Sequence, residues 1–269
     1  MKCSLMNKTR RERILDMIVR RGEGHIPSSF SIVDIVAYLY GDVLRHDPKD
    51  PSFEGRDRFI LSKGHGCAAL YVVLEEHGYL EPQDLIDYAT HGGILGGHPD
   101  RTRVPGAEAS TGSLGHGLPM AVGVAIGLRI RGRNERVFVL VGDAECNEGT
   151  VWESALVAAA RKLGNLVLIV DNNRSAEVVL PIPDFVAKFR AFGWRTSEID
   201  GHDKAAMDGV FERLETSPEG APTVIVANTV KGKGISFMER DFGKWHHRVP
   251  EGEELVAAYA EIRAVPDRV

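Results

Sequence analysis

The fold is decided by residues 137–173, which read VFVLVGDAECNEGTVWESALVAAARKLGNLVLIVDNN. This stretch contains two apolar runs, 137–141 and 166–170, and each run ends at a short polar turn. An alanine-rich segment with the composition of a helix, 151–163, lies between them. Near-continuous apolar strands joined by a helix are typical of a parallel sheet that is covered on both faces. We therefore predict a strand–helix–strand unit at the centre of a parallel sheet.

Similar patterns continue on both sides of this unit. Short apolar runs predict two more strands, at 58–61 and 223–227, and a further strand is expected near 194–199. Apolar residues at helical spacing predict helices at 5–21, 31–39, 67–77, 118–131, 185–192, 203–214 and 253–264. Ser31 is expected to cap the second of these helices, with Asp34 at its third position. The alternation predicts an α/β fold, a doubly wound and mostly parallel sheet flanked by helices.

Length and composition narrow the possible functions. We expect residues 1–269 to form a single domain with a helical N-terminal approach and a C-terminal helix. The formal charge is −5, from 33 basic and 38 acidic residues, which gives no reason to expect nucleic acid as a partner. The arginine-rich start, residues 10–21, is expected to cover the solvated face of a helix.

Two further observations concern the compartment. The longest nearly apolar run, 118–128, has about half of the ~20 residues that a membrane span needs, so no membrane partner is expected. The three cysteines include no Cys-x-x-Cys pair. This pattern fits neither a disulfide framework nor a zinc site, and it indicates a reducing, cytoplasmic compartment.

The polar turns of the central unit suggest a site for a hard cation. Asp143 follows the first strand, and Asn173 follows the second strand 30 residues later. Because the carboxyl ends of parallel strands meet at the edge of the sheet where ligands bind, we expect these side chains to lie close together. Both offer oxygen, which suits Mg²⁺ or Ca²⁺, and such ions usually complete their coordination with water and with phosphates of a ligand. The predicted ligand is therefore a phosphorylated cofactor.

Other interpretations of these residues stay open on spacing alone. Asp and Asn at strand ends are also common as turn residues and helix caps. The glycine-rich segment 110–117 leads into the helix at 118, where backbone N–H groups can face an anion. Glycine equally suits a tight contact between helices. The chain has no Gly-x-x-x-x-Gly-Lys-Ser/Thr loop, which counts against a P-loop enzyme.

Several short motifs together resemble the transketolase family. Residues 142–154 (GDAECNEGTVWES) and 171–173 (DNN) resemble its thiamine diphosphate motif, which begins with Gly-Asp-Gly and ends in Asn about thirty residues later. The other matches follow in the family's order: Gly24-His25, Leu61–Gly66, Gly96–Pro99, Thr111–Gly115, Lys231–Gly234 and Trp245-His246. The resemblance covers nearly the whole chain, and it implies the thiamine-diphosphate-binding fold of the type that holds the diphosphate.

The resemblance implies a role for each matching residue. Asp143, Asn173 and the backbone carbonyl of Ser175 match the family's Mg²⁺ ligands. The other cofactor-binding positions are His65, Gly112, Ser113, Leu114, Gly142, Ala144, Glu145 and His246; Asp143 and Asn173 are counted there as well. His65 and His246 match positions near the diphosphate and the reactive carbon.

Histidines suit such a site because imidazole can donate or accept a proton near neutral pH, and donors already in place stabilise an alkoxide. His25 and His98 match positions that hydrogen-bond the carbonyl and hydroxyls of a sugar. The candidate catalytic residues are His25, His65, His98, His246 and Glu148. Four other histidines are expected to be structural: His77, His91, His202 and His247.

The resemblance is to the family's first domain only, so the chain looks like the N-terminal subunit of a split transketolase. Such an enzyme transfers a two-carbon ketol unit from a ketose or ketose phosphate to an aldose. A second polypeptide carrying the pyrimidine-binding domain is expected to complete it as a 2+2 heterotetramer. Glu148 matches the position that meets the partner's activating glutamate, so we expect no turnover by this chain alone.

Two alternative functions remain. The chain could belong to another thiamine-diphosphate-dependent lyase or ligase, one that transfers acyl or aldehyde groups or condenses them as deoxyxylulose-phosphate synthase does. It could also be a non-catalytic binding subunit. Three departures from the family pattern, Ala144 in place of glycine, a short segment 175–181 and His247 where glycine often stands, lead us to expect a non-standard sugar or a specialised pathway.

Overall fold

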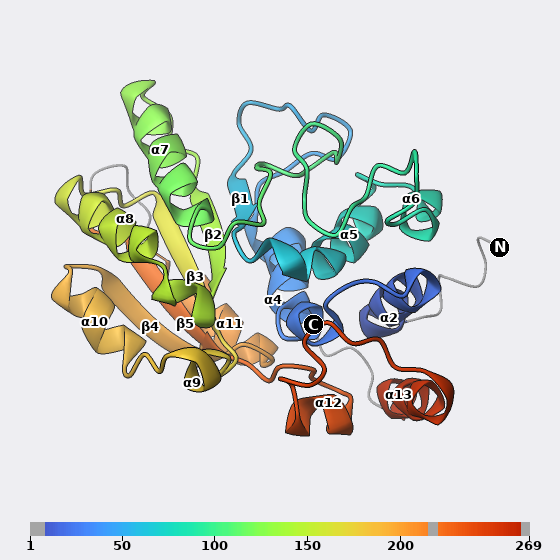
Figure 1. Ribbon diagram of the computed structural model, residues 1–269. Helices are drawn as coiled ribbons and strands as arrows, with labels where there is room; N and C mark the ends of the chain where they lie inside the picture. The colour runs from blue at the N-terminus through green and yellow to red at the C-terminus, as the bar shows by residue number, and fades with distance from the viewer. Residues whose placement is uncertain (1–8, 215–219, 265–269) are drawn as a thin grey trace.

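A parallel β-sheet forms the centre of the protein (Figure 1). The computed structural model describes residues 9–214 and 220–264. The strands are β1 (Arg58–Leu61), β2 (Val137–Gly142), β3 (Leu166–Asn172), β4 (Arg195–Asp200) and β5 (Thr223–Asn228). They lie in the order β1-β2-β3-β5-β4, and all four neighbouring pairs are parallel. The predicted parallel sheet is confirmed.

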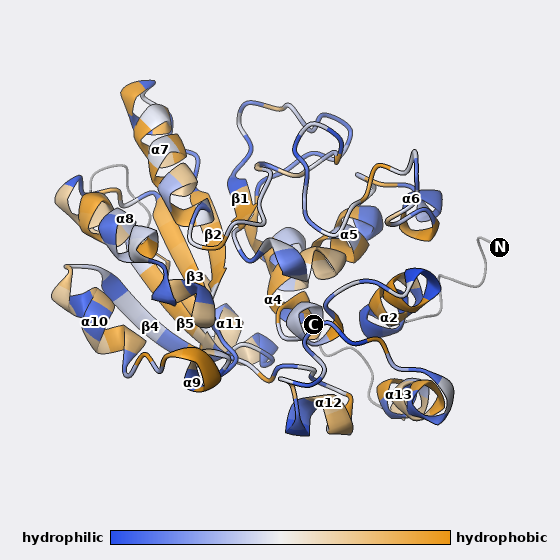
Figure 2. Cartoon of the chain, in the orientation of Figure 1, coloured by the Kyte–Doolittle hydropathy of each residue, from blue (hydrophilic) through white to orange (hydrophobic). Residues whose placement is uncertain are grey.

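Helices cover both faces of this sheet, as a doubly wound fold requires. One face carries α7 (Gly117–Ile130), α8 (Gly149–Ala160) and α10 (Phe185–Ala191), and the other carries α4 (Val33–Tyr38), α5 (Cys67–Glu76) and α11 (Lys204–Phe211) (Figure 1). Strand side chains alternate between the two apolar cores, so Phe138 and Leu140 face α4 and α5, whereas Val139 and Val141 face α7 and α8. Figure 2 shows β2 and β3 as hydrophobic, which explains their near-continuous apolar sequence.

The strand register brings the polar turns to one edge of the sheet. Gly142 pairs with Asp171, and Asn172 pairs with Asn228. The segments that follow β2, β3 and β5 therefore leave the sheet at the same level. Three short helical segments follow directly or nearby, η3 (Ala144–Asn147), α9 (Ala176–Val179) and α12 (Ser236–Arg240).

The N-terminal approach is helical, as expected, and the helix predicted at 31–39 is present. It forms α4, which continues into a π-helical turn at Leu39–Val43, and a short helix that the sequence did not predict, α3 (Ile26–Phe30), precedes it. The predicted capping box at Ser31 is wrong, because α4 has no side-chain cap. The buried Ser31 hydroxyl instead donates to the carboxylate of Asp171 (2.9 Å), and its oxygen lies 3.1 Å from the carbonyl oxygen of Ser28.

The arginine-rich helix α2 (Arg10–Arg21) begins with a capping box formed by Thr9 and Glu12. More of its charged side chains are buried than the sequence analysis expected. Arg13 is buried and forms ion pairs with Glu75 and Glu76 of α5. The expectation of a simply solvated basic face is therefore wrong for Arg13. Its aliphatic stem packs on the core while the charge is paired.

The last helix, α13 (Gly252–Ala264), packs beside α2. The hydroxyl of Tyr259 donates to Asp16 at 2.6 Å, and the guanidinium of Arg263 donates to Glu12 at 2.7 Å. Two further short helical segments complete the description, η2 (Gly64–Gly66) and α6 (Pro82–Ile86). Within residues 9–214 and 220–264, no helix is long and apolar enough to cross a membrane.

Candidate functional site

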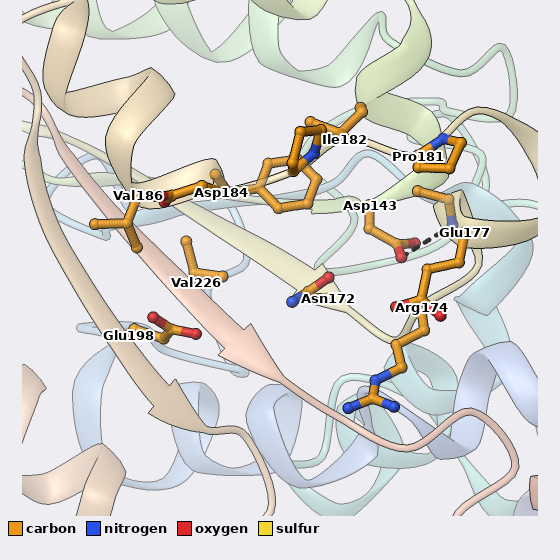
Figure 3. Close-up of a pocket in the computed structure, with 13 residues that line it drawn as sticks. Asp143, Asn172, Arg174, Glu177, Pro181, Ile182, Asp184, Val186, Glu198 and Val226 are labelled. Atoms are coloured by element: carbon orange, nitrogen blue, oxygen red, sulfur yellow. Dashed lines mark hydrogen bonds between the residues drawn. The ribbon is translucent and has the colours of Figure 1, made fainter.

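Asp143 and Asn173 lie next to each other at the carboxyl edge of the sheet. Two consecutive backbone N–H groups link them, because Ser175 donates to Oδ1 of Asn173 and Ala176 donates to Oδ2 of Asp143, both at 3.1 Å. Figure 3 draws the Asp143 bond as a dashed line. All three ligand candidates, Asp143, Asn173 and Ser175, are buried. The crossover thus brings together the two side chains that the strand pattern predicted to meet.

A buried ion pair fixes the orientation of Asn173. The carboxylate of Asp171 accepts from Nζ of Lys63 (2.5 Å), from Nδ2 of Asn173 (2.7 Å) and from the hydroxyls of Ser31 and Thr229. Asp171 and Lys63 are almost completely buried. Because the amide nitrogen of Asn173 donates to Asp171, its oxygen points to the opposite side, toward Ser175.

A pocket of about 530 Å³ opens beside these groups, and we call it the strand-end pocket. It is lined by His25, Lys63, His65, Gly112, Leu114, Gly142, Asp143, Ala144, Glu145, Asn173, Ser175, Val178, Val179, Lys231, Phe242, Gly243 and His246. Its volume is in the range of small-molecule sites. Most of the cofactor-binding residues predicted from sequence are therefore in one cavity, and Ser113 and His98, both exposed, are not among its lining residues.

Four imidazole rings gather at this pocket and form what we call the histidine cluster, His25, His65, His246 and His247. The ring of His25 lies 5.1 Å from that of His65, 5.0 Å from that of His246 and 4.7 Å from that of His247, centroid to centroid. His65 and His246 are 5.7 Å apart. His247, which was expected to be structural, belongs to this cluster because its ring packs against that of His25.

Partial burial lowers the pKa of three of these histidines, His25, His65 and His246, and keeps them neutral. It lowers the pKa of His25 to about 3 and that of His246 to about 4, and nearby histidines and Lys231 add to the effect. Burial and the neighbouring Lys63 also lower the pKa of His65. A neutral imidazole offers one donor and one acceptor, so the pocket presents both kinds of group at pH 7.

Two lysines complete the pocket, and neither received a role in the sequence analysis. Nζ of Lys231 donates to the hydroxyl of Ser175 (2.8 Å) and lies 3.3 Å from Nδ1 of His246. Burial, together with Lys63, lowers the pKa of Lys231 to about 8. A lysine in a glycine-rich loop directly after a buried strand was the signal available in the sequence. Buried cations next to Asp143 favour an anionic ligand.

The glycine-rich segment 110–117 is held by Glu145. The buried carboxylate of Glu145 accepts from the backbone N–H groups of Gly115 (2.9 Å) and Gly142 (3.0 Å) and from the hydroxyl of Ser62. Glu145 lines the pocket, but these three donors occupy its carboxylate. Its contacts therefore hold the glycine-rich segment against the end of β2. The absence of a side chain at Gly112 lets the ring of His98 approach, since a Cβ there would lie 3.1 Å from that ring.

Ala144 and Glu148 occupy the turn after β2. The N–H of Ala144 donates to Oδ1 of Asp143 at 2.7 Å, so this amide already caps the carboxylate. Glu148 is exposed just before α8, and its Cβ lies near Gly115. The Glu148 side chain is therefore accessible at the surface of the single chain.

A second pocket, of about 390 Å³, lies on the other side of Asp143 (Figure 3). Arg174, Glu177, Asp184 and Glu198 contribute its charged lining. Its lining includes no histidine and no lysine among the described residues. We therefore place the candidate site in the strand-end pocket, where buried cations and imidazoles converge.

The donor set fits a hard cation with a phosphorylated ligand. In the described part of the chain, no group of three or more His, Cys, Asp or Glu side chains is arranged to hold a metal ion. A cation here would rely on the carboxylate of Asp143, the amide oxygen of Asn173, the carbonyl of Ser175 and oxygens of the ligand itself. Burial raises the pKa of Asp143, and a bound cation would oppose that rise.

Comparisons with known proteins show the family to which the chain belongs. The family model "Transketolase, thiamine diphosphate binding domain" matches residues 3–262. One of the subunits of an apulose-4-phosphate transketolase from Actinobacillus succinogenes is 41% identical over 245 residues, which are 89% of this chain and 88% of that protein. A 6-deoxy-6-sulfo-D-fructose transketolase subunit from a Clostridium species is 36% identical over 94% of this chain and 93% of that protein.

Solved structures give the same result. The transketolase of Campylobacter jejuni matches with a TM-score of 0.85 and 29% identity over 97% of this chain, and that of Leishmania mexicana matches with a TM-score of 0.84 and 27% identity, also over 97%. This chain spans only 42% and 41% of those two chains. The protein belongs to the transketolase family, and it corresponds to the thiamine diphosphate binding domain of these thiamine-diphosphate-dependent transferases.

Proposed function

We propose that this chain is the diphosphate-holding subunit of a split transketolase, which moves a two-carbon ketol unit from a ketose or ketose phosphate to an aldose. The observation that carries the proposal is one cavity in which oxygen ligands for a cation, two buried lysines and neutral histidines converge. The similarity to transketolase subunits over most of both chains supports it.

Asp143, Asn173 and the carbonyl of Ser175 would hold Mg²⁺, or Ca²⁺ in its place, and the ion would bind the diphosphate. Lys63 and Lys231 add positive charge beside that position. Gly112, Ser113 and Leu114 would run along the cofactor. When bound, thiamine diphosphate supplies the carbon nucleophile and the electron sink for cleavage of the carbon–carbon bond next to a ketose carbonyl.

The histidines would serve the sugar. Charge develops on the carbonyl oxygen during the reaction, and a neighbouring hydroxyl must lose its proton. An imidazole N–H placed beforehand stabilises the oxygen, and an imidazole nitrogen with a free lone pair accepts the proton. His25 and His98 would contact the sugar, with His65 and His246 nearer the cofactor. The lowered pKa values of His25 and His246 leave both rings neutral and suited to either role at pH 7.

A second polypeptide would supply the pyrimidine-binding domain. Glu148 is exposed, as a residue that meets a partner must be in a single chain. The relatives from Actinobacillus succinogenes and Clostridium are named as subunits, so each of those enzymes is built from more than one chain. We propose a 2+2 heterotetramer that acts on a sugar or sugar phosphate. The cytoplasmic location stays a prediction.

Reconstitution tests the proposal. The purified chain is mixed with the product of the adjacent reading frame, Mg²⁺ and thiamine diphosphate, and the products from ketose and aldose mixtures are identified by mass spectrometry. Ketol transfer by the mixture and by neither chain alone is expected. Turnover by this chain alone would contradict the split, and condensation or acyl transfer in place of ketol transfer would favour another thiamine-dependent reaction. Failure of the mixture to bind the cofactor would indicate a non-catalytic role.

A further inference from the structure

His247 is positioned as a part of the site and not as a structural residue. Its ring makes the shortest centroid contact within the histidine cluster, 4.7 Å to His25, with the planes at 65°. His25 lines the strand-end pocket and His247 is exposed. An exposed ring that touches a lining residue lies at the rim of that pocket.

Two histidines outside the cluster, His46 and His202, have both ring nitrogens occupied by protein groups. His46 contacts the Tyr79 hydroxyl through Nδ1 (3.0 Å) and the carbonyl of Tyr40 through Nε2 (2.8 Å). His202 likewise uses both nitrogens, with Asp34 at 2.6 Å and the Val230 N–H at 2.9 Å. Within the part of the chain that the structure describes, no protein group hydrogen-bonds the ring of His247. Its nitrogens can therefore bind a ligand.

The loop that carries His247 is anchored on both sides. Before it, the indole of Trp245 is buried and packs 4.8 Å from the ring of Phe237. After it, the guanidinium of Arg248 lies 4.2 Å above the same indole and pairs with Glu254 of α13 at 2.8 Å. A residue held between two such anchors is pre-organised, which is what a contact with a substrate needs.

We propose that His247 is a specificity-determining residue that hydrogen-bonds a hydroxyl group of the sugar at the entrance above His25. The inference rests on the proposed ketol transfer. The chemistry that it would recognise is a polyhydroxylated chain beyond the transferred two-carbon unit. His25 and His246 line the pocket beside His247 and also carry ring nitrogens that can donate or accept a hydrogen bond, so the three together suit a row of hydroxyls.

The test uses the reconstituted complex with His247→Ala, His247→Asn and the control His91→Ala, which changes an exposed histidine outside the cluster. Donors are β-hydroxypyruvate, which has no polyhydroxylated chain, and a panel of five- to seven-carbon ketoses and their phosphates. We expect His247→Ala to raise KM for the ketoses about 3- to 10-fold, as loss of one neutral hydrogen bond does, and to leave KM for β-hydroxypyruvate within about 2-fold. His247→Asn keeps a donor and an acceptor and is expected to restore part of the loss.

Thiamine diphosphate affinity, measured by calorimetry, and the melting temperature are expected to be unchanged in all three variants. An unchanged KM for every ketose would overturn the assignment, and so would a His247→Ala complex that no longer assembles, since His247 would then be an interface residue. If the wild-type complex is inactive with every donor, the proposed function fails. If the wild-type complex is active and the His247 variants behave as wild type, only the role of His247 fails.

Discussion

Asp143 is the residue on which the cation site depends most. Its two oxygens accept from the N–H groups of Ala144 and Ala176, one on each side of the crossover. The substitution Asp143→Asn would keep one acceptor oxygen in the side chain and remove the negative charge. The neighbouring backbone would keep nearly the same shape.

We expect Asp143→Asn to weaken Mg²⁺-dependent binding of thiamine diphosphate by at least about 10-fold, because a hard cation prefers carboxylate to amide oxygen. Calorimetric titration of the complex with the cofactor at fixed Mg²⁺ measures this. Asp184→Asn, at the rim of the second pocket, is the matched control. Equal affinities in wild type and Asp143→Asn would remove Asp143 from the cation site.

Asp171 has a different task, since it neutralises Lys63 in the core. Asp171→Asn leaves that lysine buried without a counter-charge and is expected to lower the free energy of unfolding by about 3–5 kcal/mol. Urea denaturation measures the change. The double variant Lys63→Met/Asp171→Leu removes both charges and should be more stable than Asp171→Asn. If the single variant is as stable as wild type, the pair does not carry the role described.

The histidine cluster predicts an acid-sensitive fold. His25 and His246 have a pKa of about 3 and about 4 in the folded chain against 6.5 as the ordinary value, so below pH 6.5 the unfolded chain binds protons that the folded chain does not. The free energy of unfolding is therefore expected to be constant above pH 6.5 with respect to these groups and to fall as the pH drops toward 4. Urea denaturation from pH 4 to 7 checks this, and His25→Asn/His246→Asn should flatten the curve. If the double variant shows the same slope as wild type, His25 and His246 are not the cause of the loss of stability in acid.

At the scale of single elements, the glycine-rich segment before α7 is the most constrained. Gly115 has φ of +80°, and a Cβ there would lie 2.5 Å from the Cβ of Glu148 and 2.5 Å from the hydroxyl oxygen of Thr150. The N–H of Gly115 also donates to Glu145. A side chain at this position must displace the segment from the start of α8.

Gly115→Ala is expected to lower the free energy of unfolding by about 1–3 kcal/mol, because the positive φ disfavours alanine and the added Cβ would clash with Glu148 and Thr150. Gly123→Ala in α7 is the control, since a Cβ there meets nothing within 4 Å, and alanine should stabilise the helix by up to about 1 kcal/mol. Thermal unfolding of both variants measures the difference. Equal melting temperatures would show that the segment adapts without cost.

The elements also show how far the sequence predicts the structure. Strands β1, β2, β3 and β5 were predictable because parallel strands buried in the sheet are nearly uniform in apolar sequence, whereas β4 is a polar, only partly buried edge strand whose place was expected only approximately. The short helix α3 has only five residues, too few to show a helical period, and the role of Ser31 was missed because its hydroxyl contacts Asp171, which is 140 residues away. The short α6, α9 and α12 have four or five residues each, too few to show a helical period.

The site was predictable only in part, for a similar reason. Asp143 and Asn173 follow from the strand ends, and the matched motifs supply the histidines. Lys63, Lys231 and Asp171 take their importance from burial and from contacts between distant segments. His247 seemed structural because its place beside His25 depends on the path of the loop between α12 and α13.

On the scale of the whole molecule, an apolar segment remains uncovered next to the pocket. Val178, Val179 and Leu180 are 71%, 70% and 61% exposed, and Figure 2 shows α9 as hydrophobic. Val178 and Val179 line the strand-end pocket. Exposed apolar side chains at a binding site usually become covered in the complex.

We expect binding of the cofactor and of the partner chain to protect the amides of residues 176–180 from hydrogen exchange, detected by mass spectrometry. Light scattering of the same sample should give the mass of two copies of each chain. The exposed turn at residues 131–134, on the far end of α7, serves as the internal control whose exchange should not change. Unaltered exchange at 176–180 in the assembled complex would show that the segment stays open.

The contact between α2 and α13 has a consequence for protein engineering. These helices come from opposite ends of the described chain, and Tyr259 and Arg263 hold them side by side. A short linker could therefore join the two ends, and the chain could be reopened at the turn near Gly132, which a Cβ would not crowd. Such a circular permutant would keep every strand neighbour. The ribosome would make the Asp143 side of the strand-end pocket first and the His25 side second, which reverses the natural order.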